Sequence, residues 1–213
     1  MIRAILADDH RIVIDGLKYV LSHEGDIEIV GIAGSGEELF TILDDKKEAN
    51  ILILDMSMPG RSGIDLIEYI RRNRKSLPIL ILSMYPEAIY GIRALRAGAN
   101  GYLTKDSDAS QLLHAIRRVA AGYRFASETL MQQIMVESST APSREDHLLS
   151  DREIMVLQLL ASGSSVTDIA ENLNLSVKTI STHKSNIQNK LGLTGTAQLT
   201  RYAIARNMVA AIN

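Results

Sequence analysis

Polar side chains stand directly after four short, mainly apolar segments of the chain. Three of them are the carboxylates Asp8, Asp9 and Asp55. Converging carboxylates repel one another unless a cation lies among them, and oxygen ligands with open positions suit Mg²⁺. Such a cation would also neutralise a phosphoryl group brought to Asp55, which could act as a nucleophile and form an acyl phosphate. The Ser83 hydroxyl and the Lys105 ammonium would then hold the phosphoryl oxygens.

Each of these residues also has an ordinary structural explanation. Asp8 or Asp9 could cap the helix that follows, Ser83 could be a loop hydroxyl, and Lys105 could be solvated. The hypothesis of a shared site depends on all of them standing at strand ends on one edge of a sheet. His10 is a weaker candidate, because three adjacent residues are not expected to point into one site, and it is not predicted to be a metal ligand.

The elements that would bring these side chains together alternate along the first half of the chain. Five short, mainly apolar segments are predicted to be strands, at residues 2–7, 27–33, 51–54, 79–82 and 101–104. Helical patterns follow them, at residues 12–21, after residue 35, and at residues 63–73, 86–97 and 108–121. This alternation predicts an α/β fold with a doubly wound, five-stranded parallel sheet and right-handed crossovers. Such sheets bind ligands at the carboxyl ends of their strands, where these polar residues stand.

The second half of the chain is predicted to be a smaller, all-α domain. Residues 127–136 could form one more helix, and the polar, proline-containing segment at 137–146 is typical of a linker. Beyond it, capping boxes predict helix starts at Ser150 and Ser165. The helix that begins at Ser165 is predicted over residues 166–173, a short turn joins it to a helix over 177–191, and a last helix is predicted over 196–207. Two helices joined in this way are typical of a helix-turn-helix, whose second helix lies in the major groove of DNA.

One face of the predicted helix at 177–191 carries hydroxyl, amide and ammonium groups. Such groups suit contact with DNA phosphates and base edges. The candidate DNA-binding residues are Lys178, Thr179, Ser181, Thr182, Lys184 and Ser185. Lys184 lies near the apolar side, so it is expected to reach a phosphate rather than to read a base. An isolated helix with this pattern would more often be merely solvated, and the helix-turn-helix layout is what favours DNA.

The composition is that of an ordinary globular protein, with 46% hydrophobic and 23% charged residues. The chain contains no cysteine, which excludes disulfides and thiolate metal sites. It has neither an apolar run of about 20 residues nor a signal peptide, so no membrane contact and a cytoplasmic location are expected. The formal net charge is −2, but residues 147–213 carry six basic against four acidic side chains, a weak indication of DNA binding.

Taken together, these motifs resemble a known class of proteins across nearly the whole chain. The first half is similar to the receiver domain of two-component response regulators in Asp8, Asp9, Asp55, Pro59, Ser83, Tyr102 and Lys105. The helical segment is similar to a LuxR-type output domain, and the combination resembles the NarL/FixJ family of transcriptional regulators. This resemblance implies a flavodoxin-like receiver domain at residues 1–123, a helix and linker at 124–146, and a tetrahelical LuxR-type helix-turn-helix domain at 147–213.

The resemblance implies a role for each acidic residue. Asp55 matches the phosphoacceptor, which takes a phosphoryl group from a sensor histidine kinase. Asp9, Asp55 and the backbone carbonyl of Ser57 match the ligands of Mg²⁺, the expected cofactor, and Asp8 helps to hold the ion.

The resemblance also implies a switch. Ser83 and Tyr102 match a hydroxyl and an aromatic ring that move together on phosphorylation, and Lys105 matches a phosphate-binding lysine. The chain departs from many receiver domains in one respect, because Asp106 rather than a proline follows the lysine. A cis bond without proline costs about 2.5 to 4 kcal/mol, so a trans bond is expected there.

The implied function is phosphorylation-dependent transcription regulation, without enzymatic activity. Phosphorylation of Asp55 would promote homodimerisation and binding to promoter DNA, with RNA polymerase as a possible further partner. Residues of the last helix would form the dimer contact, although the packing of the domain core is expected to take some of them: Leu199, Tyr202, Ala203 and Arg206. Two alternatives stay open. One is a regulator that binds DNA without phosphorylation, and the other is a metal-dependent phosphatase or transferase, although such enzymes usually need a second acid where Ser57 stands.

Overall fold

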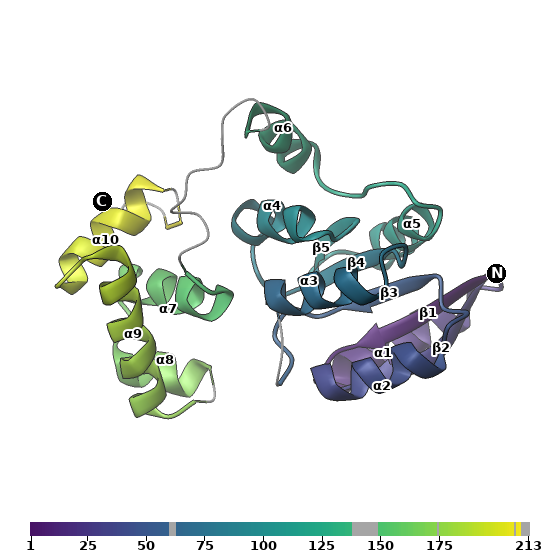
Figure 1. Ribbon diagram of the computed structural model, residues 1–213, viewed down its shortest axis with the longest axis horizontal. Helices are drawn as coiled ribbons and strands as arrows, with labels where there is room; N and C mark the ends of the chain where they lie inside the picture. Colours follow the sequence, from purple (N-terminus) through teal and green to yellow (C-terminus); the bar gives the residue numbers. More distant parts are fainter. Residues whose placement is uncertain (60–62, 138–148, 174, 207, 210–213) are drawn as a thin grey trace. The chain divides into compact units, whose positions relative to one another are not determined.

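The computed structural model describes residues 1–59, 63–137, 149–173, 175–206 and 208–209 (Figure 1). The chain divides into two compact units, Met1–Thr140 and Ala141–Asn213, and each is described by itself. Residues 138–146 of the predicted linker lie outside the described residues. Among the described helices, none is long and apolar enough to cross a membrane.

The first unit is built on a sheet of five parallel strands, as the sequence predicts. The strands are β1 (Ile2–Ala7), β2 (Ile27–Ala33), β3 (Ile51–Leu54), β4 (Ile79–Ser83) and β5 (Gly101–Thr104). Their order across the sheet is β2-β1-β3-β4-β5. The last residues of β1 and β3 are direct partners, Ala7 opposite Leu54, so the loops after these strands lie next to each other. Every residue of β3 is buried, which explains its uninterrupted apolar sequence.

Helices flank this sheet and alternate with its strands (Figure 1). They are α1 (Arg11–Ser22), α2 (Gly36–Asp45), α3 (Gly63–Asn73), α4 (Glu87–Ala97) and α5 (Ala109–Ala120). Alternate strand residues such as Ala4, Leu6 and Ile53 form one core with α1 and α5, as the two-residue period of a strand requires. Side chains also set the starts of two helices, because Ser35 and Asp108 accept hydrogen bonds from the first turns of α2 and α5.

The chain after α5 returns to the free edge of the sheet. Phe125 forms a parallel bridge with Gly101 of β5. Its carbonyl accepts a hydrogen bond from the Tyr102 amide at 3.0 Å, and its own amide donates to the Asn100 carbonyl at 3.0 Å. The edge of β5, which would otherwise expose unpaired backbone groups, is therefore partly covered by the chain itself.

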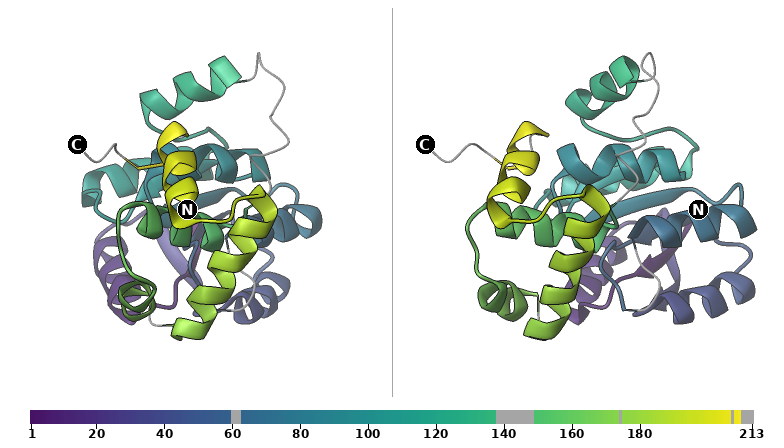
Figure 2. Two further views of the ribbon diagram at one scale, coloured as in Figure 1. Left: turned by 90° about the vertical axis from the view of Figure 1, so that its left-hand side faces the viewer. Right: turned by 60° about the vertical axis from the view of Figure 1, so that its left-hand side comes forward.

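A sixth helix of this unit, α6 (Glu128–Glu137), then packs on α4, as Figure 1 and Figure 2 show. Leu130 is 1% exposed and lies so close to Gly91 that a Cβ atom there would be 2.5 Å from its Cδ2. The Ser127 amide donates to Glu87 Oε1 at 2.9 Å. We call residues 125–130 the strap, because they attach the segment after α5 to β5 and α4.

The described residues of the second unit form four helices, also as the sequence predicts. They are α7 (Asp151–Ala161), α8 (Val166–Asn172), α9 (Val177–Leu191) and α10 (Thr196–Ala205). Ser150 and Ser165 begin α7 and α8 with complete capping boxes. Buried apolar residues from all four helices form the core of this unit: Val156, Leu157, Ile169, Ile180, Ile187, Leu199 and Ala203.

Candidate functional site

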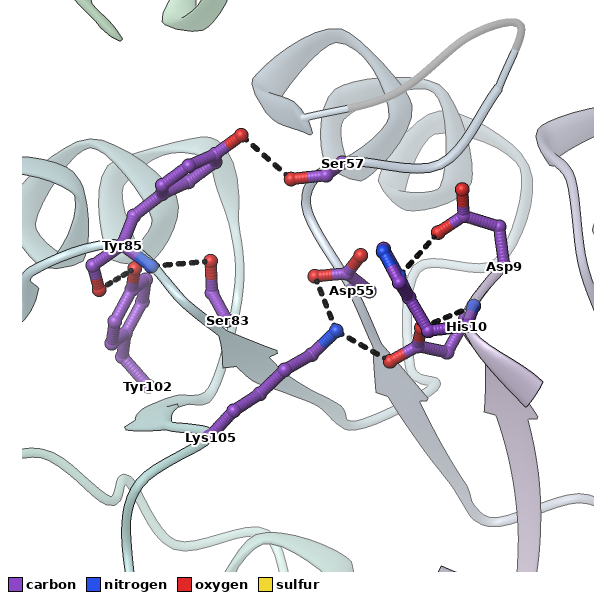
Figure 3. Close-up of polar contacts among 9 residues, drawn as sticks. Asp9, His10, Asp55, Ser57, Ser83, Tyr85, Tyr102 and Lys105 are labelled. Carbon is purple, nitrogen blue, oxygen red and sulfur yellow. Dashed lines mark hydrogen bonds and ion pairs between the residues drawn. The ribbon is translucent and has the colours of Figure 1, made fainter. Parts of the chain in front are cut away.

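Four side chains converge at the carboxyl ends of β1 and β3 (Figure 3). Asp8, Asp9, His10 and Asp55 each offer a ligand atom, and these atoms lie within 4.8 Å of one another. The convergence of the three carboxylates is as predicted. The expectation that His10 could not point into the same site was wrong. His10 is the residue before α1 and has an extended backbone (φ −89°, ψ 105°), so the chain turns there and its ring reaches back to the carboxylates.

Lys105 lies on the other side of the carboxylates and is almost buried. Its Nζ atom is 2.6 Å from Asp8 Oδ2 and 3.3 Å from Asp55 Oδ1. The Lys105 amide donates to the Ser83 carbonyl at 2.9 Å, which holds the end of β5 against the end of β4. A single ammonium therefore partly neutralises two buried carboxylates.

The Asp55 carboxylate has one oxygen without a partner. Its Oδ2 atom is buried and accepts no hydrogen bond from the described residues. Burial raises the pKa of Asp55, the Lys105 ammonium lowers it and the Asp8 carboxylate raises it again, so that the pKa lies above its ordinary value. A buried oxygen without a partner is costly, and an incoming cation or reacting group would supply one. The acidic oxygens here suit a hard cation such as Mg²⁺.

A second group of polar contacts links the loops after β3 and β4 (Figure 3). The Ser57 hydroxyl donates to the Tyr85 phenol oxygen at 2.7 Å. The Tyr85 amide donates to the Ser83 hydroxyl at 3.2 Å, and its carbonyl accepts from the Tyr102 hydroxyl at 2.9 Å. Tyr102 is 1% exposed, so its ring points inward. Tyr85 thus joins three of the predicted site residues, and its place two residues after Ser83 was the only sign of this in the sequence.

The polar face predicted on α9 is open to solvent. Lys178, Ser181, Thr182 and Ser185 are exposed, whereas Thr179 and Lys184 are half-buried. The hydroxyls of Thr182 and Ser185 donate back to carbonyls one turn earlier in the helix, at 2.9 and 3.0 Å. The opposite face packs inward through Ile180 and Ile187, which have no exposed surface.

An ion pair between the buried Glu153 and the exposed Lys190 attaches the end of α9 to the start of α7. Lys190 Nζ is 2.7 Å from Glu153 Oε2, and the same oxygen accepts from the Ser150 amide at 2.7 Å. Burial raises the pKa of Glu153, but Lys190 and Ser150 lower it more, and the pKa lies below its ordinary value. Glu153 is therefore stabilised in its charged form and holds α9 in place.

Two of the predicted dimer residues are not on the surface. Leu199 and Ala203 have no exposed surface, and they belong to the core of the second unit. Their prediction as dimer contacts is wrong, because a fully buried side chain cannot reach a second copy. Tyr202 and Arg206 are half-buried, with the Arg206 guanidinium 4.8 Å from the centre of the Tyr202 ring.

Comparison with known proteins assigns two parts of the chain to families. Residues 4–117 match the response regulator receiver domain, and residues 147–203 match the bacterial regulatory proteins of the luxR family. The oxygen regulatory protein NreC of Staphylococcus haemolyticus is 34% identical over 97% of this chain and 99% of its own length.

Solved structures of similar proteins cover nearly the same length. A structure of the RcsB response regulator of Salmonella typhimurium has 32% sequence identity and a TM-score of 0.60, covering 95% of this chain and 98% of its own. A complex of RcsB with DNA has 32% identity and a TM-score of 0.58, covering 94% of this chain and 96% of its own. The chain belongs to the NarL/FixJ family of response regulators, which join a receiver domain to a LuxR-type helix-turn-helix, and it is a phosphorylation-dependent transcription regulator that binds DNA.

Proposed function

We propose that Asp55 accepts a phosphoryl group from a sensor histidine kinase. The observation that carries the proposal is the buried Asp55 carboxylate, with Oδ1 against Lys105 and Oδ2 without a partner among the described residues. In the transfer, an Asp55 oxygen forms a bond to phosphorus while the bond from phosphorus to the donor imidazole nitrogen breaks. The electron pair of that bond stays on the nitrogen, and the product is an acyl phosphate.

The residues that would hold a Mg²⁺ ion in this reaction are Asp8, Asp9, Asp55 and the backbone carbonyl of Ser57. The close approach of the three carboxylates supports this assignment. When bound, the ion supplies positive charge that neutralises the phosphoryl oxygens. Lys105 supplies a second positive charge, and its position 3.3 Å from Asp55 suits contact with a phosphoryl oxygen.

The contacts around Tyr85 support a route by which phosphorylation is sensed. In the proposal, the Ser83 hydroxyl leaves the Tyr85 amide and donates to the phosphoryl group. The loop that carries Tyr85 then shifts, and the Tyr102 hydroxyl follows because it donates to the Tyr85 carbonyl. The Tyr102 amide is in turn bonded to Phe125 of the strap, so a movement of this pair changes how the strap is held.

The output in this proposal is promoter binding through α9 of a homodimer. The exposed residues Lys178, Ser181, Thr182 and Ser185 would contact DNA, with Thr179 and Lys184 at the border of the surface. Residues 1–123 would form the phosphoacceptor domain, 124–146 a helix and linker, and 147–213 the DNA-binding domain. One helix-turn-helix buries only about 600 to 1,000 Å² on DNA, so two copies are needed for useful affinity.

Labelling with a small phosphodonor tests the phosphoacceptor. The wild-type chain should gain one phosphoryl group in the presence of Mg²⁺, measured by the mass of the intact protein. Asp55→Asn should gain none, because an amide is not a nucleophile. Asp15→Asn, which changes an exposed carboxylate on α1, should be labelled like the wild type. Stable labelling of the Asp55→Asn protein would refute the assignment.

DNA affinity tests the output. Genomic fragments are first selected with the phosphorylated protein, and their affinity is then measured across a range of salt concentrations. Phosphorylation should raise the affinity, and an unchanged affinity would favour the regulator that acts without phosphorylation. Lys178→Ala should lower the slope of log K against log salt by about one, as expected for one lost phosphate contact. Lys18→Ala, on α1 of the first unit, is the matched control.

A further inference from the structure

The side chain of His10 lies in the acidic cluster, but it is not one of the ligands of the proposed metal site. Its Nδ1 atom is 2.9 Å from Asp9 Oδ1 and 3.2 Å from Asp8 Oδ1. The His10 backbone amide also donates to Asp8 Oδ1, at 2.9 Å. The side chain is 57% exposed, in contrast to that of Lys105, which is 6% exposed. His10 therefore approaches the carboxylates from the solvent side.

The polar contacts of the cluster show which carboxylate oxygens His10 contacts. Lys105 contacts Asp8 Oδ2 and Asp55 Oδ1, and His10 contacts Asp8 Oδ1 and Asp9 Oδ1. A cation held by Asp8 must use an oxygen that is already contacted, because His10 contacts its Oδ1 atom and Lys105 contacts its Oδ2 atom. Opposite ligands of Mg²⁺ are about 4.2 Å apart, twice its bond length, and the ligand atoms here span up to 4.8 Å. The imidazole contacts two of the three carboxylates that a cation at this site would gather around itself.

We propose that the His10 imidazole competes with the divalent cation for Asp8 and Asp9 and so sets the affinity of this site for Mg²⁺. An Nδ1 atom that donates its hydrogen to a carboxylate has no lone pair left for a metal. Mg²⁺ prefers oxygen ligands and does not recruit the ring in its place. The imidazole therefore leaves the carboxylates when the ion binds, and its exposure gives it room to turn into solvent. The inference rests on the proposed Mg²⁺ site.

The substitution His10→Ala tests this competition without removing a helix cap, because the His10 side chain makes no cap hydrogen bond to α1. Mg²⁺ is titrated into the full-length chain, and the shifts of the Ala7 and Asp55 amide signals are followed by nuclear magnetic resonance. The dissociation constant should fall about 2- to 10-fold, the factor supplied by one ordinary hydrogen bond. His23→Ala, which removes another exposed imidazole near the end of α1, should leave the constant unchanged.

Each other outcome overturns the proposal in a distinguishable way. An unchanged constant for His10→Ala would show that the ring does not compete, and a higher constant would show that it is a ligand. In both cases the proposed Mg²⁺ site and the role of Asp55 would stand. If neither the wild type nor His10→Ala bound Mg²⁺, the competition and the metal site would fail together, whereas phosphodonor labelling of Asp55 would still be tested separately.

Discussion

The Ser57 hydroxyl donates a hydrogen bond to the Tyr85 phenol at 2.7 Å, and this bond joins the loops after β3 and β4. Ser57 is two residues from Asp55, and Tyr85 is two residues from Ser83. The bond therefore closes one side of the candidate site with a phenol ring, which also packs 4.8 Å from the ring of buried Tyr90. If Asp55 is phosphorylated as proposed, the access of water to its acyl phosphate should depend on how firmly this ring is held.

Removing the bond should shorten the lifetime of the phosphorylated state. Ser57→Ala keeps the backbone carbonyl but removes the hydroxyl that donates to the phenol, and hydrolysis should accelerate about 2- to 10-fold, the factor of one hydrogen bond. Tyr85→Phe removes the same bond and should have a similar effect. The double variant should be no faster than either single variant, because both lose one shared interaction. Additive effects in a measurement of phosphate release would contradict this role for the bond.

Lys105→Ala should destabilise the first unit strongly. It leaves the buried Asp8 and Asp55 without their shared positive charge, and removing one partner of a buried pair typically costs about 3 to 5 kcal/mol. The free energy of unfolding, measured with urea, should recover partly on addition of Mg²⁺, because a cation bound only to the folded state replaces the missing charge. Lys18→Ala, whose ammonium is half exposed, should change stability little. A loss that Mg²⁺ does not reduce would argue against a shared cation site.

Leu130→Ala should release the strap. This side chain is 1% exposed against α4, and truncation of a buried leucine typically costs about 2 to 5 kcal/mol. The substitution should mainly weaken the packing of α6 on α4. Hydrogen exchange should therefore accelerate at the amides of Phe125 and Tyr102, and less in the central strands. Thr129→Ala, at an exposed position one residue earlier, is the control. Equal acceleration throughout the first unit would indicate global destabilisation instead.

Glu153 should make the second unit sensitive to acid. Its pKa lies below the ordinary value of 4.5, because Lys190 and Ser150 outweigh the effect of burial. A carboxyl whose pKa is lower in the folded state stabilises that state fully above its unfolded pKa, and this contribution is lost as the pH falls through the folded value. Unfolding of the full chain, followed at residues of α9 from pH 6 to about pH 3, should therefore show falling stability. The Glu153→Gln protein should be less stable than the wild type at pH 6, and its free energy of unfolding should fall less between pH 6 and about pH 3. The same dependence on pH in both proteins would contradict the role of Glu153.

The strands, the helices and the three carboxylates of the site could be predicted from the sequence because each depends on local chemistry. The apolar run Ile51–Leu54 needs burial on both faces, and capping residues such as Ser150 satisfy amides only a few residues away. Parallel strands end at one edge, so Asp8, Asp9 and Asp55 had to meet once the sheet formed.

The direction of single side chains was decided only by the tertiary structure. The ring of His10 turns back to Asp8 and Asp9, although the adjacency of the three residues argued against it. Tyr85 reaches Ser57 across two loops that are 28 residues apart in the chain. These orientations depend on distances between segments that the local sequence does not contain.

The tertiary structure also decided which apolar residues of α10 are on the surface and available for a dimer contact. The same spacing serves a domain core and a dimer contact, and the packing of α10 on α7 buries Leu199 and Ala203. The strap is a further case, because Leu130 has the pattern of any apolar helix residue and its partner Gly91 lies almost 40 residues earlier. Sequence periodicity determines that a face must be covered, and only the packed chain determines by what.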